Sequence, residues 1–367
     1  MFVLLFFSLL TILFTHLESK GYLKNGMAIG FGILTIIAAI RFDYGNDYMN
    51  YYTTYNQINT QEFSFSFKEL ASIYREPGWA LFNMLFSPFG EAGFYIMVAL
   101  IAVFQNSVYY KFIKQYVPMK YRWFAVLIYL FNTSLYVLNM SMLRQGLTVT
   151  ILLFCLPDIL EKKWLKTLII LFAFSTIHSS VTILLPFAFW GYLKFPSKKT
   201  WLIPAIYSVF FIICIVSKDV IERLFSIMTS IEEMQEYADI YIKDTNENSF
   251  KMGLGFIINS IPFIASLYYL AIPNNQSTDI KKIVALACIG TMIAPFGQIA
   301  QMITRISIYF HAVSVVSIPI VYYTLRPHIR KCLIAIYIAI MSYSYWIFFH
   351  SPTWIDHYYY FKTIFSI

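Results

Sequence analysis

The chain is divided into a series of apolar segments that are long enough, or nearly long enough, to cross a lipid bilayer. A transmembrane helix needs about 20 consecutive apolar residues, and charged residues make up only 13% of this sequence, against about 25% in soluble domains. The pattern predicts an all-α polytopic integral membrane protein with about 11–13 transmembrane or half-membrane helices, folded as a single domain over residues 1–367. The segments lie at about 2–17, 25–41, 92–112, 121–138, 146–160, 164–177, 180–194, 201–217, 252–272, 283–300, 307–325 and 332–350.

Several of these segments are short for a complete span, notably 146–160, 164–177 and 180–194. Short apolar segments in membrane proteins often belong to broken or re-entrant helices that line a water-filled cavity. A further piece at 79–88 is too short to cross, and we expect it to dip into the bilayer and return to the same side.

Basic residues gather in alternate loops, and this alternation predicts the orientation of the chain. Cytoplasmic loops carry an excess of Lys and Arg. With the basic clusters inside, two large loops, 42–78 and 218–251, face the exterior. In the second loop, apolar residues recur at helical spacing from 221 to 234, which predicts an amphipathic helix that serves as an interfacial connector or as a mobile lid. Residues 2–14 lack a basic region before them and are interpreted as a retained first helix.

The remaining composition excludes several classes of protein. The net charge of +8 is accounted for by the cytoplasmic loops, so no nucleic-acid partner is expected. No Walker A, H-E-x-x-H or G-x-S-x-G pattern is present, and no D-x-D motif lies in an exterior loop. We expect no cofactor and no metal. The cysteines lie in apolar runs without C-x-x-C spacing, which indicates neither zinc nor a disulfide framework; they are Cys155, Cys214, Cys288 and Cys332.

Cationic side chains lie at the ends of four apolar segments, and the predicted topology places all of them on the outer face. They are Arg41, Arg144, Arg305 and His178. A cation beside a bilayer is costly unless it meets a partner, and a planar guanidinium binds phosphate through two parallel hydrogen bonds. The pattern predicts a lipid-linked phosphate ligand, with Arg144, Arg305 and Arg41 as its binders. Snorkelling interfacial arginines are the alternative.

The segment that begins at Arg41 combines a cation, two acids, a glycine and tyrosines within 12 residues. Gly45 permits a tight turn, and we expect that turn to aim Asp43 and Asp47 back toward Arg41. Tyrosines beside carboxylates, among them Tyr51, are suited to sugar rings; an ordinary interfacial turn is the alternative. The candidates for a general base are Asp47, Glu76 and His178. Of these, Asp47 is favoured, with His178 near the phosphates.

The spacing Arg41-x-x-x-Gly45-x-Asp47-x-x-x-Tyr51 resembles the signature of the EpsG family, which is related to the Wzy polysaccharide polymerases. Three later blocks resemble further motifs of that family, and they are Glu76-Pro77-Gly78, Arg144-Gln145 and His178-Ser179-Ser180. The resemblance covers residues 41–180 by motif and the whole chain by hydropathy, whereas Arg305 depends on the physical argument alone.

The resemblance implies a multi-pass enzyme of the bacterial inner membrane that joins oligosaccharide repeats carried on undecaprenyl diphosphate, at the periplasmic face. It implies catalytic roles for Asp47, His178 and Glu76. Gln145, Asp43 and Tyr51 join the arginines as substrate-binding residues. The implied partners are the lipid-linked oligosaccharides, the bilayer and a membrane protein that regulates chain length. A ligase or another lipid-linked glycosyltransferase, a flippase and a structural scaffold remain alternatives. Sugar, linkage and stereochemical outcome stay open.

Overall fold

Helices dominate the computed structural model, which describes residues 1–60, 70, 75–195, 199–216, 254–272, 277–294 and 301–365. The chain forms two compact units, Met1–Tyr192 with Ile338–Ile367 and Leu193–Tyr337, and each is described by itself. Within the described residues only β1 (Arg41–Phe42) and β2 (Lys362–Thr363) are strands. The all-α membrane fold is therefore confirmed, whereas the single domain stays a prediction. The amphipathic helix expected at 221–234 lies outside the described residues.

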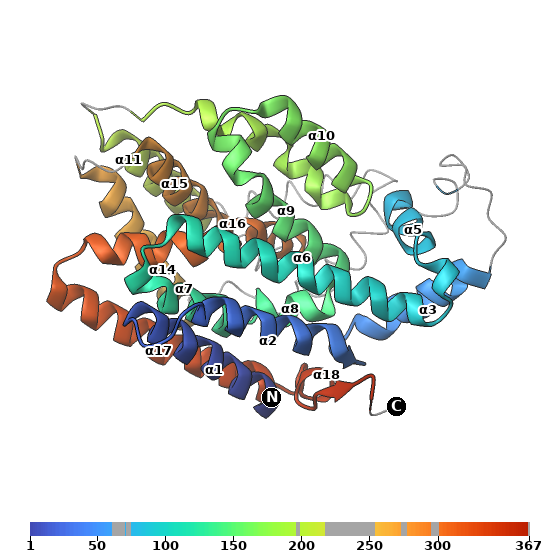
Figure 1. Ribbon diagram of the computed structural model, residues 1–367. Coiled ribbons are helices and arrows are strands. Elements are labelled where there is room, and N and C mark those ends of the chain that lie inside the picture. The colour runs from blue at the N-terminus through green and yellow to red at the C-terminus, as the bar shows by residue number, and fades with distance from the viewer. Residues whose placement is uncertain are drawn as a thin grey trace. The chain divides into compact units, whose positions relative to one another are not determined.

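The first unit contains most of the residues that the sequence singled out (Figure 1). Its elements are α1 (Phe2–Ser19), α2 (Gly26–Ile40), β1, α3 (Tyr48–Thr60), α5 (Pro77–Met84), η1 (Ser87–Phe89), α6 (Ala92–Tyr116), η2 (Met119–Tyr121), α7 (Arg122–Phe131), α8 (Tyr136–Ser141), α9 (Leu143–Leu160), α10 (Trp164–Ser175), the 3-10 helix η3 (Ser179–Tyr192), α18 (Ile355–Tyr358) and β2. The second unit contains α11 (Leu202–Val216), α14 (Leu254–Ala271), α15 (Thr278–Ile293) and α16 (Gln301–Thr324). Helix α17 (Pro327–His350) runs from the second unit into the first.

Within the part of the chain that the structure describes, five helices are long and apolar enough to cross a membrane, and they are α1, α6, α9, α16 from Arg305 onward, and α17. The shorter apolar helices include α2, α10 and η3, so the predicted short segments 164–177 and 180–194 are confirmed. The apolar segment 146–160 belongs to a longer helix than expected, because α9 begins at Leu143 with Arg144 and Gln145 in its first turn and is long enough to cross.

The segment predicted at 121–138 is broken into α7 and α8. The Asn132 side chain accepts a hydrogen bond from the backbone N–H of Ser134 at 3.1 Å. An asparagine that bonds backbone two residues on offers the chain a local turn in place of a helix. This Asx turn is the physical reason for the break, which apolar composition alone did not reveal.

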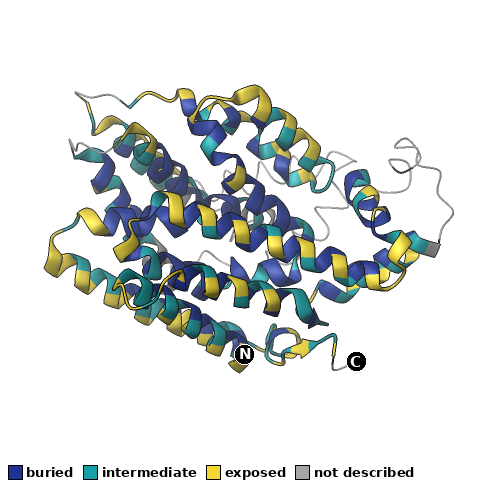
Figure 2. Ribbon diagram, in the orientation of Figure 1, coloured by how far each residue is buried: buried dark blue, intermediate teal, exposed yellow. Residues whose placement is uncertain are grey.

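Burial separates the inner helices from the outer ones (Figure 2). In α9, 78% of the residues in the apolar stretch are buried, whereas in α1 only 22% of them are. The exposed residues of α1 are largely apolar and recur at helical spacing, as expected of a helix face that meets lipid. Its most exposed large side chains are Phe2, Phe6, Leu9 and Leu13.

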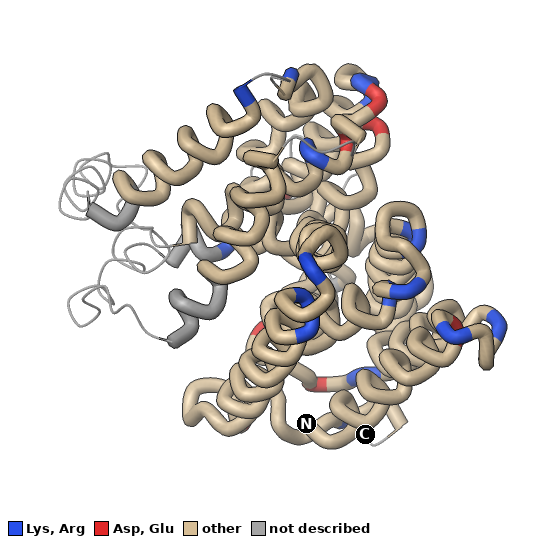
Figure 3. The backbone as a smooth tube through the Cα atoms, turned by 90° about the vertical axis from the view of Figure 1, so that its left-hand side faces the viewer, with Lys and Arg blue, Asp and Glu red and all other residues tan. Residues whose placement is uncertain are grey.

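The two ends of the first unit differ in the elements and charged residues that lie there. Helix α2 ends and α6 begins where α3 and α5 lie (Figure 1). At the other end α6 reaches the basic residues Lys111 and Lys114, and the turn after α9 holds Lys162 and Lys163. Lys and Arg lie mainly at helix ends in the tube view (Figure 3). The orientation predicted from the basic loops stays a prediction.

The predicted tight turn at Gly45 is present. Gly45 has φ +95° and Asp43 has φ +45°. A Cβ atom on Gly45 would overlap the side chain of Ser141 in α8. Glycine is therefore needed here both for the left-handed backbone and for the close approach of α8.

Replacing Gly45 by alanine is expected to lower the free energy of unfolding by about 2 kcal/mol or more, because backbone strain and overpacking add at this position. Thermal unfolding in detergent measures the effect. Gly32→Ala in α2 is the matched control, since nothing lies within 4 Å of a Cβ there. Equal midpoints for the two variants would show that the turn is not as described.

Candidate active site

The carboxylate of Glu76 is the centre of a polar cluster in the first unit. Its Oε2 forms an ion pair with Nη1 of Arg144. Its Oε1 lies 2.8 Å from Nδ1 of His178 and accepts a hydrogen bond from the backbone N–H of Ser179 at 2.9 Å. Three of the sequence blocks, separated by 68 and 102 residues from Glu76 to its partners, thus meet at one carboxylate.

The local sequence explains how Glu76 reaches its partners. Pro77 occupies the first turn of α5, where its fixed φ and missing N–H are tolerated. The N–H of Gly78 donates to the carbonyl oxygen of Thr176 at 2.9 Å, and a Cβ on Gly78 would overlap Thr176. This close contact joins α5 to the end of α10. His178 and Ser179, which follow α10, are therefore held beside Glu76.

Arg144 lies in the first turn of α9 and is flanked by aromatic rings. Its guanidinium carbon is 5.4 Å from the centre of the Tyr51 ring, a separation at which cation and ring attract. The Tyr51 ring meets Trp79 of α5 edge-on at 5.6 Å. The Arg144 side chain is 35% exposed, so a ligand can reach it.

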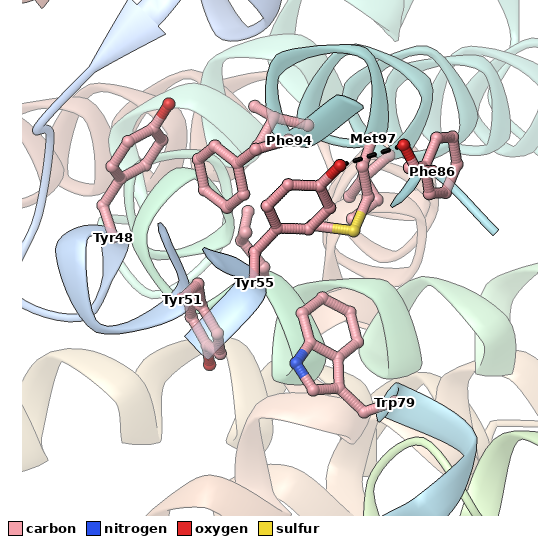
Figure 4. Packing of buried hydrophobic residues seen from close by; sticks show 10 residues of the cluster. Tyr48, Tyr51, Tyr55, Trp79, Phe86, Phe94 and Met97 are labelled. Carbon is pink, nitrogen blue, oxygen red and sulfur yellow. Dashed lines mark hydrogen bonds between the residues drawn. The ribbon is translucent and has the colours of Figure 1, made fainter. Parts of the chain in front are cut away.

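Tyr51 and Trp79 belong to a larger aromatic cluster, which Figure 4 shows. It joins α3, α5 and α6, and the hydroxyl of Tyr55 donates to the carbonyl oxygen of Phe86 at 2.9 Å. Rigid rings of this kind fix the side chains packed on them. The buried members are Tyr48, Tyr51, Tyr55, Trp79, Phe86, Phe94, Met97, Val98, Ile101 and Leu143.

Burial by itself would raise the pKa of Glu76, but the hydrogen bond from His178, the charge of Arg144 and the hydrogen bond from the Ser179 N–H outweigh it. Together they lower the pKa of Glu76 from 4.5 to about 2. The carboxylate is therefore ionised throughout the physiological range. An ionised carboxylate with so low a pKa is a poor proton acceptor and a good anchor for cations.

This lowered pKa predicts how stability depends on pH. Because the folded-state pKa of Glu76 lies below the unfolded value, its contribution is complete above about pH 5 and is lost as the pH falls toward 2. The difference in thermal midpoint between the wild type and Glu76→Gln is therefore expected to stay constant from pH 8 to 5 and to shrink at pH 3.5. Thermal unfolding in detergent checks this, and a difference that grows on acidification would contradict it.

Arg41 is buried in the first unit, with 1% of its surface exposed. Its Nε donates to the carbonyl oxygen of Met140 at 2.8 Å, and Nη1 donates to that of Ala38. The guanidinium carbon lies 5.7 Å from the Tyr48 ring centre. Arg41 thereby links the end of α2 to α8, and its direct contact with phosphate stays a prediction.

The two acids of the signature turn have different surroundings. The carboxylate of Asp43 pairs with Nζ of Lys362 at 2.6 Å, so the expectation that the turn aims Asp43 at Arg41 was wrong. The backbone N–H of Asp47 donates to Oγ of Ser141 at 3.3 Å, and its carboxylate accepts from the amide of Asn46 at 3.1 Å. The roles predicted for both acids stay predictions.

The other predicted residues divide between the units. Gln145 is buried beside Arg144 in α9. Arg305 belongs to α16 in the second unit and is half-buried, so its phosphate-binding role stays a prediction. Among the described residues, no three or more His, Cys, Asp or Glu side chains are grouped to hold a metal ion.

Some participants were missed by sequence reasoning. Ser179 was named only as part of a motif, and Trp79 directly follows Glu76-Pro77-Gly78. Both residues could therefore have been predicted from the motifs beside them. Tyr358 and Lys362, which contact Asn46 and Asp43, carry no sequence signal that points to the turn. Their separation from it exceeds 310 residues, with 312 and 319 positions between the partners.

The fold and the site together define a multi-pass helical membrane protein with an arginine, a histidine and aromatic rings arranged around one carboxylate. The chain matches the family model of the EpsG family over residues 24–362. It belongs to the EpsG family. It is accordingly a polysaccharide polymerase-like membrane protein with glycosyltransferase-type activity. Neither a curated protein nor a solved structure matches the chain.

Proposed function

We propose that this protein polymerises oligosaccharide repeat units carried on a polyprenyl diphosphate, undecaprenyl diphosphate in bacteria, at the periplasmic face of the inner membrane. The product is a surface polysaccharide such as O-antigen, capsule or exopolysaccharide. The observation that carries this proposal is the placement of Arg144, which is fixed by Glu76, stacked on Tyr51 and still exposed at a helix N-terminus.

This placement is suited to the leaving group of the reaction. Cleavage of the bond between the anomeric carbon and the diphosphate oxygen puts negative charge on the departing phosphate. A cation that is held in position before the reaction stabilises that charge without reorganisation, and this is commonly the largest catalytic contribution. The N–H groups of the first turn of α9 add donors at the same place.

The transfer joins the growing chain to a hydroxyl group of the incoming repeat. The acceptor oxygen forms a bond to the anomeric carbon, the bond to the diphosphate breaks, and the electron pair leaves with the polyprenyl diphosphate. The proton of the acceptor hydroxyl passes to a base, which we assign to Asp47. Glu76 is assigned the role of holding Arg144 and His178, because its low pKa and three donors leave it little basicity.

The experiment that tests the proposal is the incubation of the purified protein in liposomes with a polyprenyl-diphosphate oligosaccharide, followed by gel analysis. A ladder of products at intervals of one repeat is expected, with release of polyprenyl diphosphate. In cells, deletion of the gene is expected to leave surface glycan of a single repeat. Loss of all surface glycan, with no ladder from the purified protein, would instead indicate a flippase or a ligase.

A further inference from the structure

Two helices of the first unit, α8 and α18, and the neighbouring residue Asp47 contact the side chain of Asn46. Its Oδ1 accepts hydrogen bonds from Oγ of Ser141 in α8 at 3.1 Å and from the hydroxyl of Tyr358 in α18 at 2.8 Å. Its Nδ2 donates to Oδ1 of Asp47 at 3.1 Å. Ser141 and Tyr358 are fully buried, whereas Asn46 and Asp47 reach toward solvent.

The direction of these hydrogen bonds is fixed by chemistry. An ionised carboxylate only accepts, so the NH₂ end of Asn46 must face Asp47. The carbonyl end of Asn46 then faces Ser141 and Tyr358, and both hydroxyls must donate. The phenol of Tyr358 thus helps to orient, together with Ser141, an amide whose other end meets the carboxylate of Asp47.

The C-terminal segment that provides Tyr358 is attached to the same turn by its backbone. Strands β1 and β2 pair antiparallel, with Arg41 opposite Thr363 and Phe42 opposite Lys362. The N–H of Gly45 donates to the carbonyl oxygen of His357 at 2.9 Å. We call residues 355–363 the C-terminal clamp.

Aromatic packing reinforces the attachment. The Tyr44 ring contacts the rings of Tyr358 at 5.5 Å and Phe361 at 5.2 Å. The backbone N–H of Tyr51 donates to the carbonyl oxygen of Asp47, one turn earlier, at 3.1 Å. The clamp therefore sets the first turn of α3, and with it the ring on which Arg144 lies.

We propose that Tyr358 is a positioning residue for Asp47, acting through the amide of Asn46. The role rests on the proposed function, in which Asp47 takes the proton of the acceptor hydroxyl. A base must be held within hydrogen-bond reach of that proton and in its ionised form. Tyr358 meets both needs, because it fixes the amide that orients and stabilises the carboxylate.

Tyr358→Phe tests this role, because it removes the hydroxyl and keeps the ring that packs on Tyr44. With purified protein and a polyprenyl-diphosphate oligosaccharide, kcat is expected to fall about tenfold while KM stays unchanged. The acid limb of the pH–rate profile is expected to move to higher pH, because the amide no longer favours the ionised carboxylate. A merely structural role would reduce the amount of folded protein without moving that limb.

Among the described residues, Tyr51, Tyr358 and Arg144 near Asp47 each keep one charge state across the pH range of the profile. Tyr51 and Tyr358 interact with it electrostatically, and burial raises the pKa of both, that of Tyr358 to about 12. Arg144 lies across the Tyr51 ring and stays charged. Asn46→Ala gives a second readout: its effect and that of Tyr358→Phe are expected to be less than additive in the double variant, since both break one relay.

Tyr360→Phe is the matched control, because Tyr360 lies in the same segment with 70% of its surface exposed, and wild-type kinetics are expected. An unmoved acid limb in Tyr358→Phe, or additive effects with Asn46→Ala, would overturn the positioning role alone. Absence of any polymerisation by the wild-type protein would overturn the proposed function instead.

Discussion

Arg144→Ala is expected to reduce polymerisation by about 10³-fold, because it removes the cation that faces the departing diphosphate. Arg144→Lys keeps the charge but loses the planar fork and the stacking on Tyr51, so an intermediate loss of about 10²-fold is expected. Product ladders from purified protein in liposomes measure both. The fall should appear mainly in kcat, since the charge develops in the transition state.

Arg75→Ala is the control for Arg144, because Arg75 is an exposed arginine immediately before Glu76. Its activity is expected to stay within about twofold of the wild type, as for an exposed charge that screening weakens. Gel filtration in detergent shows whether each variant is folded. A folded Arg144→Ala protein that produces a normal ladder would remove Arg144 from the reaction.

Glu76→Gln has the second largest expected effect. The substitution keeps the shape of the side chain but removes the charge that holds Arg144 and His178. Breaking a buried charge pair costs about 2–5 kcal/mol, and a loss of about 10²-fold in kcat/KM is expected when Arg144 moves from its place. Glu76→Asp, which restores the charge on a shorter stem, should recover part of the activity.

Glu91→Gln controls for the general loss of a carboxylate in the first unit. Glu91 is exposed and accepts a hydrogen bond from the hydroxyl of Tyr52, away from the Glu76 cluster. Activity close to that of the wild type is expected. Similar losses in Glu76→Gln and Glu91→Gln would mean that net surface charge, and not the pairing of Glu76, governs the reaction.

Much of the fold could be predicted because a bilayer imposes length and composition on each helix. Helices α1, α2 and α6 begin within about a residue of the apolar segments expected for them. Errors arose where a local hydrogen bond competes with helix formation, as at Asn132 between α7 and α8. The apolar segment 146–160 was judged short for a span, because Arg144 and Gln145 are polar, although the first turn of a helix tolerates them.

The site could be predicted only as separate motifs. Glu76, Arg144 and His178 were each singled out, but no periodicity indicates that one carboxylate binds the other two across 68 and 102 residues. The pairing of Asp43 with Lys362 was likewise hidden, because it depends on the antiparallel contact of β1 with β2. Long-range contacts of this kind are set by the packing of whole helices, which composition does not encode.

The pairing of β1 with β2 also determines how early in synthesis this part of the protein can fold. Residues 41–47 leave the ribosome early, whereas their partners at 357–363 are synthesised more than three hundred positions later. Contacts between such distant parts of a chain form late in folding. A nascent chain therefore lacks the contact of Tyr358 with Asn46 until its C-terminal segment has been made. Under the proposed function, a half-made copy of the chain is expected to be inactive toward its substrate.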